Sequence, residues 1–468
     1  MRPATGIMRR KAIDAEPAGA SPALARTLSW WHLVALGVGA IVGTGIYTLV
    51  GVGAGLAGPG VLLSFLVAGA ICCCAALAYA EVASMIPASG SAYTYSYVAI
   101  GEIVAWVVGW SLILEYSLVV SAVAVGWSGY AAGFLASVGM PLPVALAAGP
   151  YAGGIVNLGA MLIVFAVAGL LALGTRESAT VNAALVIVKL AALALFVGAA
   201  LPAFDMAHFH PFLPSGFAGM GADGRPIGVM AAAAIIFFAF YGFDAISTAA
   251  EEARNPARDL PIGIIGSMLA CTLIYVAVAA AAVGALPYTT YASSPEPLAL
   301  ILRSLGHGRA AVLIGAAAVV ALPTVILAFL YGQSRIFFVM ARDGVLPPAL
   351  AAVNARTGTP VRVTLITACA VALIAGLVPL DRIAALANAG TLAAFIAVSA
   401  CMLILRRRDP AGARSFRAPI AWVIGPLAIL GCLYLFFSLP GQTRLFFFAW
   451  NAVGLAVYAL WRRVGSTA

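Results

Sequence analysis

Long apolar runs alternate with short polar or glycine- and proline-containing connections along almost the whole chain. A helix that crosses the hydrocarbon core of a bilayer, roughly 30 Å thick, needs about 20 residues. Twelve runs have about that length or more, at about 32–57, 60–86, 102–136, 153–174, 180–201, 227–251, 260–286, 309–340, 361–379, 382–405, 419–438 and 444–462. The pattern therefore predicts an all-α integral membrane protein with twelve transmembrane helices.

Two of these runs, the first and the sixth, carry signals for a broken helix. The first holds Gly37, Gly39, Gly43 and Gly45, and each glycine costs about 1 kcal/mol relative to alanine in a helix interior. The sixth holds a weaker interruption at residues 237–244, a stretch that ends in an acid. Close helix packing through glycine is the alternative explanation. Interrupted helices at matching positions of two repeats indicate the binding site of a transporter.

The matching positions predict a chain organised as two five-helix repeats. We expect these repeats at residues 30–201 and 227–405, with a further pair of helices at 419–462. Unwound backbone at membrane depth is tolerated only where its N–H and C=O groups line a cavity and meet a polar ligand. An amino acid supplies both partners, because its carboxylate accepts from N–H groups at a half-helix N-terminus and its ammonium donates to freed carbonyls.

Composition and charge support a lipid environment and set an orientation. The 468 residues are 63% hydrophobic and 9% charged, with a mean hydropathy of +1.07. With both termini in the cytoplasm, 19 Lys and Arg residues lie on the inner side and five on the outer side. This asymmetry matches the enrichment of Lys and Arg in cytoplasmic loops. Residues 1–29 then form a cytoplasmic tail. The basic residues lie between apolar runs and form no nucleic-acid-binding patch; those at 406–408, 414 and 417 suggest an anchor to anionic membrane lipid.

Four ionisable residues fall inside the predicted spans. Each costs roughly 2.5–3.5 kcal/mol on insertion scales and is a candidate functional residue. Lys189 is the one Lys or Arg far from both interfaces, and a structural ion pair or snorkelling of the side chain to one interface is the alternative. Glu115 lies near the middle of span three, where a role beside the substrate and a helix–helix hydrogen bond are equally open. Glu81 and Asp244 lie nearer the cytoplasmic ends, where gating or packing is favoured over direct binding.

Several short motifs occur in a characteristic order and spacing. They are Gly43-Thr44-Gly45-Ile46-Tyr47, Tyr79-Ala80-Glu81, the run from Pro87 to Tyr95, Leu114-Glu115-Tyr116, Gly126-Trp127-Ser128-Gly129-Tyr130, Glu251-Glu252-Ala253-Arg254-Asn255-Pro256 and Tyr331-Gly332-Gln333-Ser334-Arg335. On these motifs the chain resembles the amino acid, polyamine and organocation transporters, specifically the bacterial members of the cationic amino acid transporter branch. The resemblance runs from Gly37 to about Trp461.

The resemblance implies a LeuT-type fold, in which two inverted five-helix repeats surround a central site. It implies a carboxylate site at the amides of Thr44 and Gly45, beside a break at Ile41 and Gly43. It also implies an ammonium site at the carbonyls of Phe238, Ala239 and Tyr241. Lys189 matches a span-five lysine that replaces the coupling metal in proton-driven members. Two departures are Pro323 in span eight and the absence of the two further spans that animal members have.

The sequence thus predicts a secondary active transporter in the inner membrane of a bacterium, with the proton as coupling ion and no other cofactor. Leu322 and Pro323, in an aliphatic stretch, are expected to narrow the pocket and to favour small neutral L-amino acids such as alanine. Arginine or lysine, with Glu115 as counter-charge, is the alternative cargo. The spans are too apolar for the polar pore of a channel, and they carry neither a nucleophile–base pair nor a metal cluster for an enzyme. Accessory subunits cannot be read from this pattern.

Overall fold

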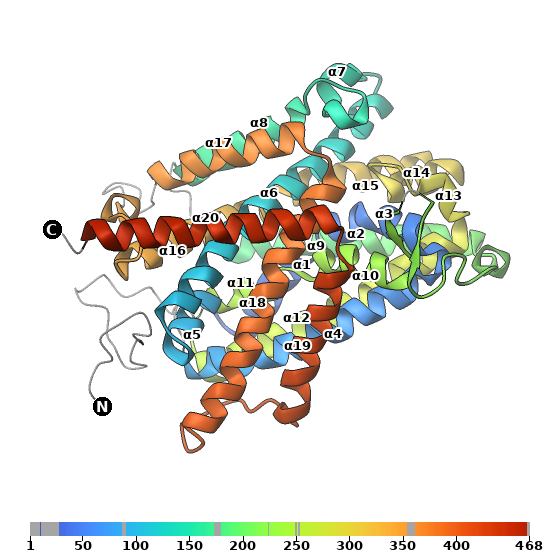
Figure 1. Ribbon diagram of the computed structural model, residues 1–468. Coiled ribbons are helices and arrows are strands. Elements are labelled where there is room, and N and C mark those ends of the chain that lie inside the picture. Colours follow the sequence, from blue (N-terminus) through green and yellow to red (C-terminus); the bar gives the residue numbers. More distant parts are fainter. Residues whose placement is uncertain are drawn as a thin grey trace.

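The computed structural model is almost entirely helical (Figure 1). It describes residues 10, 28–86, 90–172, 179–222, 224–248, 250, 253–352 and 361–465. Most of the predicted N-terminal tail therefore lies outside the described residues, as do residues 87–89 at the start of the Pro87 to Tyr95 motif and the Glu251-Glu252 pair.

The helices follow the predicted runs. The first part of the chain forms α1 (Trp30–Ile41), α2 (Thr44–Tyr47), α3 (Leu49–Ala57), η1 (Gly58–Gly60), α4 (Val61–Met85), α5 (Ser91–Ala99), α6 (Glu102–Ser137), α7 (Val144–Ala147), η2 (Pro150–Ala152), α8 (Leu158–Ala172), α9 (Ala179–Ala200), η3 (Leu201–Ala203) and η4 (Met206–Phe209). A short hairpin of β1 (Gly219–Met220) and β2 (Pro226–Ile227) follows, with antiparallel pairing of Gly219 to Ile227.

The second part begins after this hairpin. It forms α10 (Val229–Ile236), η5 (Phe237–Phe240), α11 (Phe243–Thr248), α12 (Pro256–Ala285), α13 (Tyr288–Tyr291), α14 (Pro297–Ser304), α15 (Gly308–Ala321), α16 (Pro323–Arg342), η7 (Pro348–Ala351), α17 (Val361–Leu377), α18 (Leu380–Arg408), α19 (Ala421–Ser438) and α20 (Gly441–Gly465).

Membrane-spanning helices dominate the described residues. Nine helical stretches are long and apolar enough to cross a membrane, and α1, α8 and α17 are shorter apolar helices. Each of the twelve predicted runs contains all or part of one of these nine stretches or three shorter helices. The prediction of an integral, all-helical membrane protein is confirmed, whereas the exact number of twelve crossings and the inverted-repeat arrangement stay predictions.

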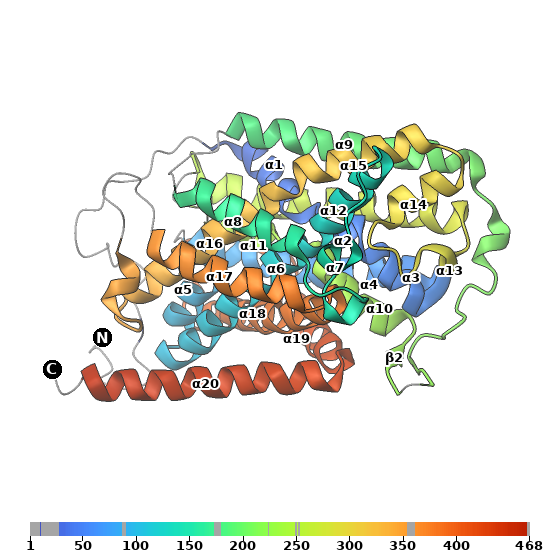
Figure 2. The same cartoon turned by 90° about the horizontal axis from the view of Figure 1, so that it is seen from above.

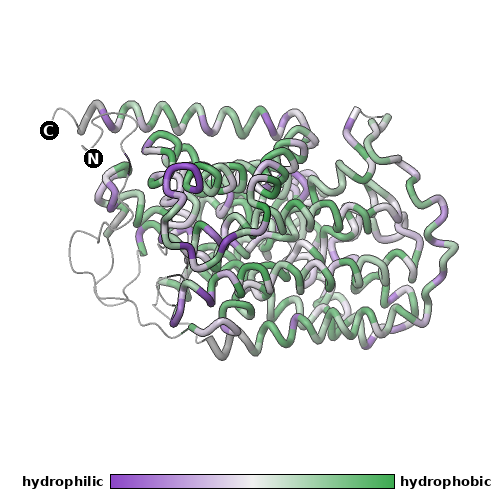
Figure 3. The backbone as a smooth tube through the Cα atoms, turned by 90° about the horizontal axis from the view of Figure 1, so that it is seen from below, coloured by the Kyte–Doolittle hydropathy of each residue, from purple (hydrophilic) through white to green (hydrophobic). Residues whose placement is uncertain are grey.

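The helices form an elongated bundle, in which most of them run side by side (Figure 2). The start of α1 and the end of α20 lie at one end, and the β1–β2 hairpin, α13 and α14 lie at the other. Near the centre, α1 packs against α12 and α9, while α6 packs against α16 and α18. Most residues are hydrophobic on the hydropathy scale, and the most hydrophilic ones lie in loops such as the one between α18 and α19 (Figure 3).

Span eight contains a junction that the apolar pattern does not show. The predicted run at 309–340 forms two consecutive helices, α15 and α16, which meet at Leu322. Pro323 is the first residue of α16, a position that suits proline because its missing N–H would have no intrahelical acceptor there. Pro323 therefore has a structural role at a helix start.

Candidate functional site

The first predicted helix break lies between α1 and α2. α1 ends at Ile41, Gly43 has φ −152° and ψ −149°, and α2 begins at Thr44. The last carbonyls of α1 and the first N–H groups of α2, those of Thr44 and Gly45, consequently lack partners within their own helices. The glycine-rich motif does break the helix, as its composition predicts.

The second predicted break lies between α10 and α11. α10 passes into the 3-10 turn η5, Tyr241 is extended with φ −65° and ψ 150°, and Gly242 takes φ +116° before α11 begins. This φ lies in a region that side chains rarely adopt, so glycine is needed there. Both interruptions thus lie where the sequence predicts them.

The two breaks touch each other through glycine. A Cβ atom at Gly45 would lie 2.3 Å from Cα of Ala239, and one at Gly242 would lie 2.7 Å from the carbonyl carbon of Ala40. The Tyr275 hydroxyl lies 2.7 Å from the carbonyl oxygen of Ile41 and 2.8 Å from that of Ala239. One side chain of α12 therefore bridges the freed carbonyls of both breaks.

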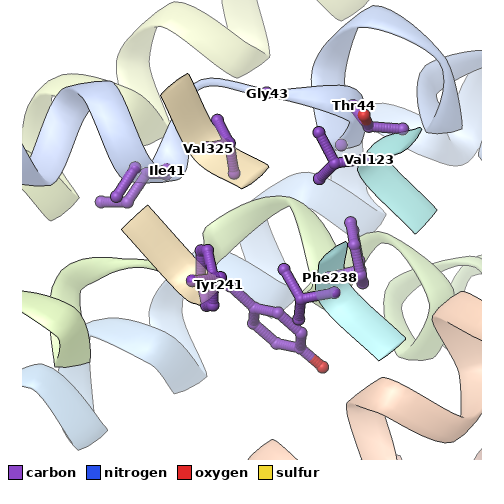
Figure 4. A pocket seen from close by; sticks show the side chains of 11 residues that line it. Ile41, Gly43, Thr44, Val123, Phe238, Tyr241 and Val325 are labelled. Atoms are coloured by element: carbon purple, nitrogen blue, oxygen red, sulfur yellow. The ribbon is translucent and has the colours of Figure 1, made fainter. Parts of the chain in front are cut away.

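A small pocket opens at this junction (Figure 4). Its lining consists of Ala40, Ile41, Gly43, Thr44, Gly45, Val119, Val123, Phe238, Tyr241, Val325 and Phe329. The cavity volume is about 10 Å³, which is room for about one water molecule. At this volume the pocket is too small for an amino acid, which would enter only after side chains or helix halves move.

Six of the ten predicted substrate-binding residues line the pocket. They are Ile41, Gly43, Thr44, Gly45, Phe238 and Tyr241. Ala239 packs directly on Gly45. Among the described residues, the lining does not include Glu115, Leu322 or Pro323. The wall opposite the breaks comes instead from α6 and α16.

That wall was missed by the sequence analysis. Val119 and Val123 are four residues apart on α6, and Val325 and Phe329 are four residues apart on α16. Spacing of this kind places both members of each pair on one helix face. The same spacing recurs on lipid-facing sides of these apolar helices, so it could not single out the pocket face.

Asn388 of α18 is a second residue that the sequence analysis missed. The Tyr241 hydroxyl, which points away from the labelled pocket residues in Figure 4, donates to Oδ1 of Asn388. The Asn388 amide in turn donates to the carbonyls of Ala234 and Ile235, the latter at 3.2 Å. Asn388 is fully buried and satisfies carbonyls that the end of α10 leaves free.

The buried acids have different surroundings. Asp244 accepts from the Tyr116 hydroxyl and from the Gly242 N–H, both at 3.2 Å, so it stabilises the second break. Glu115 faces α18, where a Cβ atom at Gly390 would lie 3.1 Å from its own Cβ. Its Oε2 has no hydrogen-bond partner among the described residues.

Lys189 of α9 is completely buried beside the first break. Its ammonium donates to the carbonyl of Gly39 at 2.7 Å and to the Thr324 hydroxyl at 2.9 Å. The Tyr47 hydroxyl, from α2, donates to the Lys189 carbonyl at 3.1 Å. Lys189 therefore connects both halves of the first broken helix to span eight.

Comparisons with known proteins identify the family of this chain. A family model described as amino acid permease matches residues 28–460. The branched-chain amino acid permease BcaP of Bacillus subtilis (strain 168) is 45% identical over 98% of both chains. The methylthioribose transporter of the same organism is 40% identical over 98% of both chains. The vacuolar cationic amino acid transporter 2 of Arabidopsis thaliana is 40% identical over 86% of this chain and 64% of its own length.

The family model covers nearly the whole chain, including both broken helices, the α6 and α16 walls and Lys189. It confirms the resemblance seen in the sequence motifs, and with it amino acid transport as the function. The chain therefore belongs to the amino acid permease family and transports amino acids.

Proposed function

We propose that this protein is a proton-coupled carrier that takes up neutral aliphatic L-amino acids across the inner membrane of a bacterium. The observation that carries the proposal is the meeting of two broken helices at an apolar pocket, with a buried lysine beside the first break. The proposed frame is the LeuT-type arrangement of repeats at 30–201 and 227–405, with 419–462 added. Both termini are proposed to be cytoplasmic.

The ends of the broken helices are the proposed binding groups for the α-carboxylate and α-ammonium. The amides of Thr44 and Gly45 open α2, and a helix N-terminus favours a negative charge. The carbonyls of Ile41, Phe238, Ala239 and Tyr241 lie at the breaks and would accept from the ammonium. Those of Ile41 and Ala239 already lie within hydrogen-bond distance of the Tyr275 hydroxyl, but a carbonyl oxygen has a second lone pair for a further donor.

The pocket wall supports a neutral aliphatic side chain as cargo. Val119, Val123, Val325 and Phe329 supply the lining opposite the breaks, and an apolar wall offers no partner to a charged side chain. The similarity to a branched-chain amino acid permease supports leucine, isoleucine and valine beside alanine. Glu115, the acid that a cationic cargo would use, is not part of the lining.

The proton is the proposed coupling ion, and Lys189 is its proposed carrier. A charged ammonium donates to Gly39 and Thr324 and so ties the inner half of the first broken helix to span eight. Loss of the proton weakens this tie, because a neutral amine is a poorer donor. The inner half of the helix is then free to swing away and release substrate to the cytoplasm.

Uptake into proteoliposomes tests the proposal. The purified protein is reconstituted, an inward proton gradient is imposed, and each of the twenty amino acids competes with labelled leucine and labelled alanine. We expect saturable uptake that alanine and the branched-chain amino acids inhibit, and that arginine and lysine do not. Inhibition by arginine and lysine alone would contradict the neutral assignment.

A variant pair tests which residues set the size of the cargo. Phe329→Ala is expected to admit larger side chains such as phenylalanine, because it removes bulk from the lining while the backbone groups at the breaks are untouched. Size discrimination in an apolar pocket is typically about 10- to 200-fold, so inhibition constants should change on that scale. Leu322→Ser is the control, since Leu322 is buried outside the lining. A changed competition profile in Leu322→Ser alone would contradict the assignment.

A further inference from the structure

A second cavity lies where α18 turns into α19, far from the pocket at the breaks. Its volume is about 180 Å³, and it is lined by Arg406, Pro410, Arg414, Arg417 and Trp422. The turn projects from the bundle at the lower edge of Figure 1 and faces the viewer as a strongly polar loop in Figure 3. We call this cavity the arginine pocket.

Glu81 of α4 holds the arginine pocket in shape. Its carboxylate accepts from Nε and Nη2 of Arg406 at 2.8 and 2.6 Å, and from the backbone N–H of Ala418 at 2.8 Å. Nε of Arg414 lies 3.3 Å from the same carboxylate, and the Arg414 side chain is 2% exposed. Its Nη2 also donates to the carbonyls of Leu405 and Asp409, at 3.0 and 2.7 Å. The loop is thus a built structure, and Glu81 is one of its supports.

The arginine pocket carries more positive charge than Glu81 can balance. Three guanidinium groups line it and one carboxylate pairs with two of them, which leaves an excess of two positive charges. Asp409, next to the cavity, would remove one, while Arg407 and Arg408 add two. Arg417 is exposed, and no hydrogen bond or ion pair of its side chain occurs within the described part of the chain. Guanidinium groups bind phosphate oxygens with charge-assisted hydrogen bonds.

An exposed apolar stripe begins at the arginine pocket and follows α19. It consists of Trp422, Val423, Leu427, Leu430 and Tyr434, each at least 50% exposed. The positions from 423 to 434 are spaced by four and three residues, so they share one helix face. Tryptophan is enriched at membrane–water interfaces. The Arg407 guanidinium lies over the Trp422 ring, 5.4 Å from its centroid. Charge and apolar surface therefore adjoin as they do in a phospholipid.

We propose that the arginine pocket binds the phosphate headgroup of an anionic phospholipid, with the acyl chains lying along the α19 stripe. Because Glu81 pairs with Arg406 and Arg414, the lipid-bound loop would remain tied to α4. Inorganic phosphate offers the same headgroup chemistry without the chains, so the stripe is what favours lipid.

Lipid binding to the purified full-length protein tests this proposal. In detergent, dioleoylphosphatidylglycerol, dioleoylphosphatidylcholine or inorganic phosphate is added, and bound lipid is counted by native mass spectrometry alongside the Tm. We expect phosphatidylglycerol to be retained and to raise the Tm, and the other two additions to do neither. Arg417→Gln should weaken retention by about tenfold or more, as the loss of a hydrogen bond to a charged group does. Trp422→Ala should weaken it as well.

Arg362→Gln is the matched control, since Arg362 is an exposed arginine at the start of α17, outside the arginine pocket. It should retain phosphatidylglycerol as the wild type does. Equal losses in Arg417→Gln and Arg362→Gln would overturn the proposal in favour of general charge attraction. An equal Tm increase with inorganic phosphate would overturn the lipid assignment in favour of a free-anion site.

Discussion

Lys189→Ala is expected to abolish proton-driven accumulation of amino acids while leaving substrate binding measurable. The ammonium is buried and donates to the Gly39 carbonyl and the Thr324 hydroxyl. Alanine removes both bonds and the titratable group. Binding should persist because the proposed partners of the substrate are backbone groups at the breaks, and these do not include the lysine side chain.

The measurement compares uptake and binding on the same preparation. Liposomes with an imposed inward proton gradient should accumulate labelled leucine with the wild type, and the Lys189→Ala variant should remain at the level of liposomes without protein. Ile187→Ala, on an exposed position of the same helix, is the control and should accumulate normally. Wild-type pH dependence in Lys189→Ala, or accumulation by the wild type on a sodium gradient alone, would refute the coupling role.

Gly45→Ala and Gly45→Val are expected to abolish both binding and transport. A Cβ atom at this position would lie 2.3 Å from Cα and 2.5 Å from Cβ of Ala239, which is far inside any real contact. The substitution must push α2 and η5 apart, and the proposed carboxylate and ammonium groups separate with them. Valine adds a β-branched bulk in the path of the carboxylate.

A second glycine provides the matched control for this effect. Gly198, in the last turn of α9, has open space around the position of a Cβ atom. Gly198→Ala should transport normally and stabilise the fold slightly, by up to about 1 kcal/mol, because alanine is the better helix former. Wild-type binding of alanine by Gly45→Val would place the site elsewhere.

Substrate analogues test the same site on the unaltered protein. Amino acid amides keep the ammonium and lose the carboxylate, so they should fail to compete with labelled leucine if the amides of Thr44 and Gly45 hold the carboxylate. This arm does not depend on whether a Gly45 variant folds. Competition by leucinamide as strong as that of leucine would contradict the carboxylate assignment.

The sequence by itself determined the features whose free-energy cost depends on the residue type and not on distant parts of the fold. Glycines at 43 and 45 disfavour a continuous helix wherever they occur in one, and an ammonium at membrane depth is expensive whatever surrounds it. The two breaks and the position of Lys189 at membrane depth could therefore be predicted from residue type and spacing, whereas the coupling role of Lys189 stays a prediction. The apolar runs likewise predicted a membrane protein, because a bilayer sets their length.

The roles of the buried acids required the tertiary structure. The sequence placed Glu81, Glu115 and Asp244 at membrane depth, but it could not tell which of them would meet a partner. Glu81 meets Arg406, 325 positions away along the chain, whereas Glu115 faces α18 and stays outside the pocket lining. Only long-range packing separates a structural ion pair from a carboxyl beside a site.

The wall of the pocket was likewise decided by the tertiary structure alone. Val325 and Phe329 line it, whereas Leu322 and Pro323, the predicted wall, lie at the junction of α15 and α16. In a membrane helix both the lipid-facing and the protein-facing sides are apolar, so hydrophobic periodicity does not mark the interior face. Tyr275 and Asn388 remained unnoticed for a related reason. Both side chains donate hydrogen bonds to backbone carbonyls at the breaks, and those carbonyls belong to helices that are distant in the sequence.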